Sequence, residues 1–296
     1  MLYIFYLLNA LLMVGMPIAL AVWLVRKTKA PWMLFGIGAV TFIGSQVVHL
    51  PLNWGLTALF RALLPNPQPQ WWHLPFNAVV LGLTAGLCEE TARYVGYRWL
   101  AKKGRALAWR DALMLGAGHG GTEAILLGLL VAVTFVNMVI VRDIDLKQLG
   151  LTGQTLELAQ QQVAAYWSAP WYMALLGALE RFITLFVQVS FAVLILQVFT
   201  RKDWRWLLVA ISYHLIVDAV AVIGVRSGWP MLIIEAVIVP FALISLGIIL
   251  GLRPRGEPLV PSEPEPVLIA GASDSLRPAL DRADDLNRQL DQSKYT

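Results

Sequence analysis

Seven long apolar stretches account for most of the first 252 residues. A helix that crosses a bilayer needs about 20 mostly apolar residues. Seven stretches meet this requirement, at residues 3–25, 31–50, 75–97, 111–140, 171–199, 206–224 and 230–252. The sequence therefore predicts an all-α fold, a polytopic transmembrane helix bundle with about seven spans.

Charged residues are too scarce in this region for a soluble protein. Of the 42 charged residues, 14 stand in residues 253–296, so only 28 remain for the first 252 residues. Soluble proteins carry about 25% charged residues on average. A soluble enzyme and a disordered regulator are therefore excluded. The single cysteine, Cys88, excludes an internal disulfide framework and a cysteine-based zinc finger.

The basic residues lie in short loops on one side of the predicted bundle. The loops after the first, third, fifth and seventh spans hold 13 Lys and Arg, whereas the opposite loops hold four. Cytoplasmic loops are enriched in Lys and Arg, so the N-terminus is expected outside and the C-terminus in the cytoplasm. This clustering is typical of membrane orientation, and no nucleic-acid partner is expected.

Two segments fall outside the spans. Residues 156–167 of an outer loop have the pattern of an interfacial amphipathic helix. Residues 253–296 form a Pro-rich, charged cytoplasmic tail, with a flexible or extended linker and at most a short helix near 276–290. The predicted domains are therefore a transmembrane domain at 1–252 and this tail.

Ionisable side chains occur inside the predicted spans, although each costs about 2.5–3.5 kcal/mol in a bilayer. The set comprises Glu89, Glu90, Arg93, Glu123, Glu180, Arg181, Asp218 and Glu235, together with His119 and His214. Residues four apart share a helix face. His119 therefore shares a face with Glu123, and His214 with Asp218. Arg93 follows the two glutamates by four and three residues, so its guanidinium can pair with either carboxylate.

The depth of these groups predicts a common site. At 1.5 Å per residue, Glu90, His119 and His214 lie about 10–15 Å from the cytoplasmic ends of their spans. Two imidazoles and one carboxylate would complete a three-ligand site for a divalent metal, with water as the fourth ligand. Alternatively, a buried Glu would take a proton from water without a metal. His49 and His73 are expected at the opposite, outer interface, in structural roles.

The polar motifs resemble a known family. Glu89-Glu90-Thr91-Ala92-Arg93 resembles the EExxR motif of the CAAX-protease and bacteriocin-processing superfamily, and His214 to Asp218 resembles its HxxxN/D motif. The segment Gly118-His119-Gly120-Gly121-Thr122-Glu123-Ala124 and the pair Glu180-Arg181 are similar to the YhfC-type branch, which is described as intramembrane metalloproteases. The resemblance covers about residues 75–225.

This resemblance implies an intramembrane peptidase that acts near the cytoplasmic leaflet of a bacterial plasma membrane. It implies membrane lipid and a peptide or membrane-protein substrate as partners, and a divalent metal, Zn, as cofactor. Catalytic roles would fall to Glu89, Glu90, His119, His214 and Asp218. Glu90, His119 and His214 would bind the metal. Supporting roles would fall to Arg93, Glu123, Glu180, Arg181 and Gln188.

One position departs from the YhfC-type pattern. That pattern has a His eight residues after the Glu of its Glu-Arg pair, where this chain has Gln188. Gln is a poor metal ligand, so a catalytically inactive scaffold or chaperone of the same fold is an alternative. A proton-coupled transporter that uses Glu123, Glu180 and Asp218 is another. No clear internal repeat is found in the sequence, which disfavours the transporter.

Overall fold

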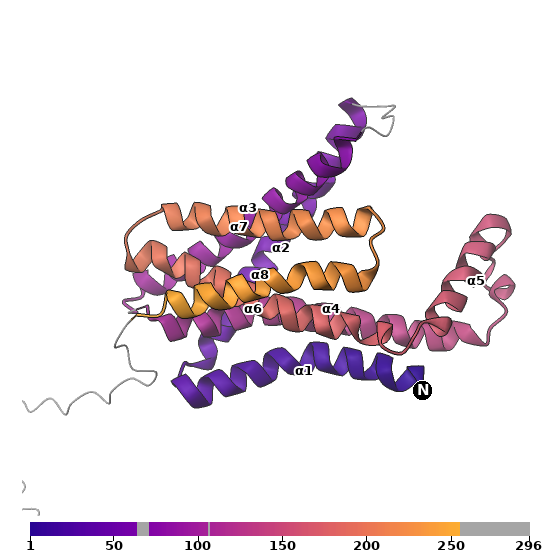
Figure 1. Cartoon of the computed structure of the whole chain (residues 1–296), viewed down its shortest axis with the longest axis horizontal. Helices are drawn as coiled ribbons and strands as arrows, with labels where there is room; N and C mark the ends of the chain where they lie inside the picture. Colours follow the sequence, from indigo (N-terminus) through magenta and orange to yellow (C-terminus); the bar gives the residue numbers. More distant parts are fainter. Residues whose placement is uncertain (64–70, 106, 255–296) are drawn as a thin grey trace, which may run out of the picture. The chain divides into compact units, whose positions relative to one another are not determined.

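The computed structural model describes residues 1–63, 71–105 and 107–254, which belong to one compact unit and are helical over most of their length. The long helices are drawn in Figure 1. In chain order the elements are α1 (Leu2–Thr28), α2 (Trp32–Leu63), α3 (His73–Lys102), α4 (Trp109–Arg142), η1 (Leu146–Leu149), α5 (Gly153–Ser168), η2 (Met173–Leu175), α6 (Leu176–Thr200), α7 (Arg205–Arg226) and α8 (Met231–Gly251).

Each predicted span corresponds to one long helix. Within the described residues, six segments are long and apolar enough to cross a membrane, namely α1, α2, α4, α6 with η2, α7 and α8. The remaining predicted span corresponds to α3, which has 30 residues. The charged side chains of Glu89, Glu90 and Arg93 lower the mean hydropathy of this helix. It nevertheless packs against α2, α6 and α7. The predicted all-α, multi-pass membrane fold is confirmed.

Helix α2 extends beyond its predicted span. The apolar stretch ends at residue 50, whereas the helix continues through Pro51 to Leu63. A proline inside a helix removes one backbone hydrogen bond, and helices in membranes tolerate this loss because neighbouring groups satisfy the freed backbone. Hydropathy therefore predicted the extent of the apolar segment but not the end of the helix. The first additional turn includes Asn53, whose Oδ1 atom accepts from the hydroxyl of Thr84 in α3 at 2.9 Å.

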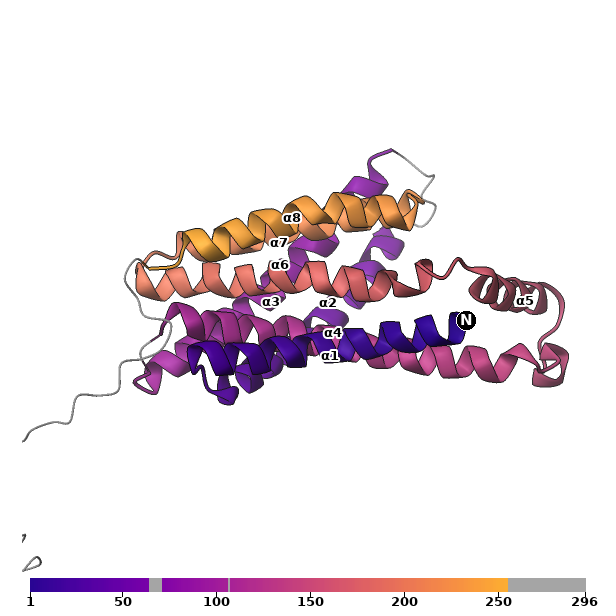
Figure 2. The same ribbon diagram turned by 60° about the horizontal axis from the view of Figure 1, so that its bottom comes forward.

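Helices α4 and α6 lie at the centre of the bundle and pack against each other and against most of the other long helices. Helix α4 packs against α1, α2 and α6, while α6 also packs against α3, α7 and α8. Figure 2 shows α1 alongside α4, and α8 alongside α6. The main apolar core includes buried residues of both central helices, for example Met114 and Leu115 of α4 and Phe191 and Val193 of α6. This core holds α4 and α6 at a fixed spacing.

Two glycines bring site-bearing helices into close contact. A Cβ atom added to Gly118 of α4 would lie 2.1 Å from the carbonyl oxygen of Phe35 in α2, which is too close for any side chain. Small residues permit such approach between membrane helices. The next residue, His119, also contacts α2, because its Nδ1 atom lies 2.9 Å from the hydroxyl of Thr41. In α3, a Cβ atom on Gly86 would lie 3.3 Å from Cβ of His214 in α7, so these helices also approach closely.

The outer loop contains the predicted helix. Helix α5 covers residues 156–167 and has no buried residue along its length. It is joined to α1 where the hydroxyl of Tyr6 donates to the backbone carbonyl of Tyr166 at 2.7 Å, with the two rings stacked at 4.1 Å. Partial burial of Tyr166 beside Tyr6 raises the pKa of Tyr166 to about 12. The predicted linker and short helix of the tail lie outside the described residues, apart from Arg253 and Pro254.

Candidate functional site

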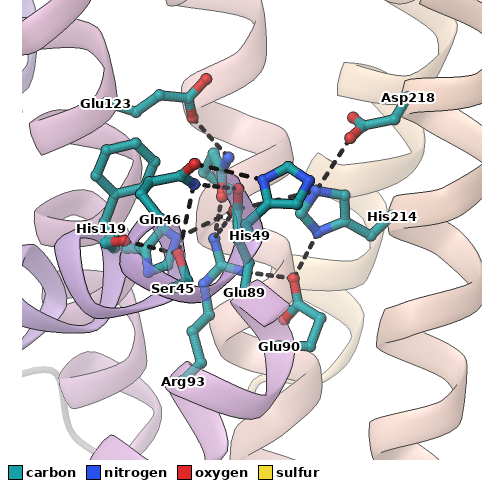
Figure 3. A network of polar contacts seen from close by, with 12 residues as sticks. Ser45, Gln46, His49, Glu89, Glu90, Arg93, His119, Glu123, His214 and Asp218 are labelled. Atoms are coloured by element: carbon teal, nitrogen blue, oxygen red, sulfur yellow. Dashed lines mark hydrogen bonds and ion pairs between the residues drawn. The ribbon is translucent and has the colours of Figure 1, made fainter. Parts of the chain in front are cut away.

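Three helices bring two carboxylates and two imidazoles together inside the bundle (Figure 3). Helix α3 contributes Glu89 and Glu90, α4 contributes His119, and α7 contributes His214. Their exposed fractions are 6%, 0%, 0% and 3% in that order. Four of the five residues predicted to be catalytic therefore lie in one buried cluster, and the fifth, Asp218, is only partly buried beside it.

The carboxylate of Glu89 lies at the centre of this cluster. Its Oε2 atom is 3.1 Å from Nε2 of His119 and 4.0 Å from Nε2 of His214. On the other side of His214, Oδ2 of Asp218 lies 3.5 Å from the same Nε2 atom. Both imidazoles thus direct Nε2 toward Glu89, and one of them also faces Asp218.

Hydrogen bonds at Nδ1 determine the tautomer of each neutral imidazole. Nδ1 of His119 lies 2.9 Å from the hydroxyl of Thr41, which itself donates to the carbonyl of Gly38 at 2.7 Å. A hydroxyl has one hydrogen, so Thr41 must accept from Nδ1–H of His119. Nδ1 of His214 lies 2.7 Å from Oε1 of Glu90, and an ionised carboxylate only accepts. In the neutral rings, both Nε2 atoms therefore carry lone pairs.

The chemical types of these donors, but not their present positions, are those of a divalent-cation site. Lone pairs that face a carboxylate repel it unless positive charge lies between them. Two imidazole nitrogens and a carboxylate are a common ligand set of catalytic zinc, and metal-binding histidines usually donate their other N–H to an outer partner. Among the described residues, no group of three or more His, Cys, Asp or Glu side chains is placed so that it could hold a metal ion. Cation binding would therefore require small rotations of Glu89 and the imidazoles.

Glu90 has different neighbours from Glu89. Its Oε1 atom accepts from the guanidinium of Arg93 and from Nδ1 of His214. Its buried Oε2 atom has no hydrogen-bond partner among the residues that the structure describes. The guanidinium also donates to Oε1 of Gln188 and lies 3.6 Å from Oε2 of Glu89. Oε1 of Glu90 thus contacts Nδ1 of His214, while Glu89 faces both Nε2 atoms. The assignment of Glu90 as a metal ligand stays a prediction.

A second group of charged side chains adjoins the first. Arg181 donates to Oε1 of Glu123 at 2.6 Å and to the carboxylate of Glu180. The amide nitrogen of Gln188 donates to Oε2 of Glu123 at 2.7 Å, while its oxygen accepts from Arg93. Gln188 therefore links the two groups and uses both ends of its amide. The five predicted supporting residues form one connected network.

Aromatic rings limit the rotation of both imidazoles. The ring of Phe191 stacks on His214, with centroids 4.5 Å apart and planes 2° from parallel. The ring of Phe42 meets His119 edge-on at 5.3 Å. Sequence reasoning did not identify these rings, because an apolar residue in a membrane helix gives no local sign of its neighbour.

Sequence reasoning also missed the contribution of α2. The amide of Gln46 donates to Oε1 of Glu89 at 3.2 Å, and its oxygen lies 3.3 Å from Nδ1 of His49. The expectation that His49 stands apart from the site is therefore wrong. A signal was present in the sequence, since Thr41, Ser45 and His49 recur every four residues and so share one helix face.

Comparisons with known proteins agree with this picture. A family model described as YhfC intramembrane metalloprotease matches residues 12–239. The chain is 32% identical over 216 residues to the Bacillus subtilis (strain 168) protein named Uncharacterized membrane protein YhfC, which covers 72% of this chain and 81% of that protein. No solved structure matches the chain. The family match includes α2 through α7, and thus all helices that contribute to the site. The chain belongs to the YhfC intramembrane metalloprotease family.

Proposed function

We propose that this protein is an intramembrane peptidase that hydrolyses a peptide bond with a water molecule activated by Glu and His side chains, assisted by a divalent cation. Zn²⁺ is the cation that this ligand set favours. The observation that carries the proposal is the convergence of Nε2 of His119 and Nε2 of His214 on the carboxylate of Glu89. The family description also supports it.

In this proposal Glu89, His119 and His214 hold the cation. When bound, such a cation lowers the pKa of a water molecule and polarises a peptide carbonyl. Thr41 and Glu90 accept the Nδ1–H groups and thereby keep both Nε2 lone pairs directed inward. Arg93 neutralises Glu90 and holds its carboxylate against His214.

Peptide hydrolysis also needs a group that moves a proton. The water oxygen bonds to the carbonyl carbon, the C–N bond breaks, and the proton lost by water must reach the leaving nitrogen. Asp218 suits this task, because its side chain is 37% exposed and its Oδ2 atom lies 3.5 Å from Nε2 of His214. If the reaction uses no cation, Glu89 is the proton acceptor.

The substrate class follows from the surroundings of the site. A buried site within apolar helices favours a peptide or membrane-protein segment that enters from lipid. The distribution of Lys and Arg supports a site nearer the cytoplasmic leaflet.

Metal analysis of detergent-purified protein tests the cation. The wild type is expected to hold about one equivalent of a divalent metal, and the double variant His119→Ala/His214→Ala to lose it. His73→Ala is the matched control, because it removes an imidazole at the start of α3, away from the site. A wild type without metal, or a double variant that keeps it, would overturn the metal-assisted mechanism.

Proteolysis is tested separately. Membranes from cells that lack the protein are complemented with the wild type, Glu89→Gln or His119→Ala, and new N-termini of membrane proteins are compared by mass spectrometry. Cleavages restored by the wild type alone support a peptidase. Equal cleavage by all three proteins would refute it.

A catalytically inactive scaffold of the same fold is the second candidate, favoured by Gln188. This residue stands where the family pattern has a His, and both ends of its amide are engaged by charged neighbours. A scaffold predicts partner proteins that co-purify equally with the wild type and with Glu90→Gln, with no difference in membrane-protein N-termini.

A further inference from the structure

We infer that Gln46 of α2 is a positioning residue for Glu89, and that it is held in place by a hydrogen-bond series of fixed direction. We call Gln46, His49 and Asn53 the α2 series. The inference deepens the proposed function and rests on it for its catalytic consequence. Neither the sequence motifs nor the family match singles out these three residues.

The α2 series runs along one face of the helix toward the site. Its contacts begin where Nε2 of Gln46 lies 3.2 Å from Oε1 of Glu89. They continue with Oε1 of Gln46 at 3.3 Å from Nδ1 of His49, and with Nε2 of His49 at 2.8 Å from Nδ2 of Asn53. At the far end, the hydroxyl of Thr84 in α3 lies 2.9 Å from Oδ1 of Asn53.

The chemistry of Glu89 fixes the direction of every contact. An ionised carboxylate only accepts, so Gln46 must turn its NH₂ group toward Glu89 and its oxygen toward His49. That oxygen requires a hydrogen on Nδ1 of His49, which leaves Nε2 as an acceptor for the NH₂ group of Asn53. The oxygen of Asn53 then faces the hydroxyl of Thr84. Each residue of the α2 series therefore donates to the next group on the side of Glu89, and Gln46 donates to Glu89 itself.

The two oxygens of Glu89 consequently have separate roles. Oε1 accepts from Gln46, whereas Oε2 faces Nε2 of His119 and of His214. A carboxylate held at one oxygen cannot rotate freely, so the other oxygen stays aimed at the imidazoles. Gln46 thus performs on Glu89 the function that Glu90 performs on His214.

The positions of the residues of the α2 series argue against a purely structural role. Val47, Val48 and Leu50 on the same stretch of α2 are exposed at the apolar surface of the bundle. Polar side chains in a membrane helix carry a cost, so they mark contacts that the protein requires. A purely structural tie between α2 and α3 would change stability but would leave the carboxylate of Glu89 and its ligand strength unaltered.

The first test reads the carboxylate directly. In infrared difference spectra of detergent-purified protein, the band that disappears in Glu89→Gln is assigned to Glu89. Gln46→Leu is expected to shift this band, because one oxygen loses its donor. Thr57→Val is the control, since it removes an exposed hydroxyl of α2 that donates to the backbone carbonyl of Asn53 in the same helix. Gln46→Met is a second variant if the leucine variant does not fold.

The second test measures Zn²⁺ affinity by competition with a chromogenic chelator. Loss of an outer partner of a metal ligand typically weakens metal affinity about 10–100-fold, and a loss of about tenfold is expected for Gln46→Leu. His49→Gln keeps one donor and one acceptor, so it is expected to retain the wild-type Zn²⁺ affinity. His49→Phe has neither, so it is expected to weaken Zn²⁺ binding.

The outcomes separate this inference from the proposed function. An unshifted band together with Zn²⁺ affinity within twofold of the wild type overturns the positioning role of Gln46. Equal affinities for His49→Gln and His49→Phe overturn the role of the α2 series. If the wild type binds no Zn²⁺, the metal-assisted function fails, and the infrared band alone decides whether Gln46 holds Glu89.

Discussion

Replacing Arg93 with Met should destabilise the protein strongly. The guanidinium is fully buried, pairs with the fully buried carboxylate of Glu90, lies 3.6 Å from Glu89 and donates to Gln188. Removing one partner of a buried ion pair costs about 3–5 kcal/mol, because the other charge is left uncompensated. At about 2–4 °C per kcal/mol, the melting temperature should fall by about 6–20 °C.

Thermal unfolding in detergent, followed by the fluorescence of the 12 tryptophans, provides the measurement. Adding Glu90→Met to Arg93→Met should recover most of the loss, since apolar replacement of a whole buried pair is often neutral. Recovery should be incomplete, because Gln188 still lacks its donor. Arg98→Met is the control, with the same change at an exposed position of α3. A loss below about 1 kcal/mol for Arg93→Met, or a double variant no more stable than Arg93→Met alone, would refute the reasoning.

Three further predictions concern packing and the network. Gly118→Ala should lower the melting temperature because its Cβ would meet a backbone oxygen at 2.1 Å, whereas Gly15→Ala, with nothing within 4 Å, should leave it unchanged or raise it; equal effects of the two would contradict the α2–α4 crossing. Phe191→Ala removes a buried ring that stacks on His214 and should cost about 3–5 kcal/mol in chemical unfolding; a cost below 1 kcal/mol would contradict that packing. Gln188→His should keep the fold. If the scaffold alternative holds, this variant should cleave membrane proteins, whereas the wild type does not. Cleavage by the wild type itself would exclude that alternative.

The helices and many local pairings could be predicted from the sequence. A bilayer requires apolar helices of about 20 residues, so the seven long helices followed from the seven apolar stretches, and within the described residues six of them are long and apolar enough to cross a membrane. Residues three or four apart share a helix face, which anticipated the pairing of Arg93 with Glu90 and the proximity of His214 and Asp218. These predictions succeeded because each depends only on the period of one helix.

Only the tertiary structure decided which carboxylate faces the imidazoles. Adjacent residues of a helix point about 100° apart, so Glu89 and Glu90 face different neighbours, and the rotation of α3 determines which one meets His119. That rotation depends on the close crossing of α3 with α7 at Gly82 and Gly86. The contribution of α2 was likewise invisible, because Gln46 and Glu89 are 43 residues apart. Helix periodicity is a property of the local sequence, whereas the orientation of one helix against another is determined by packing across the whole bundle.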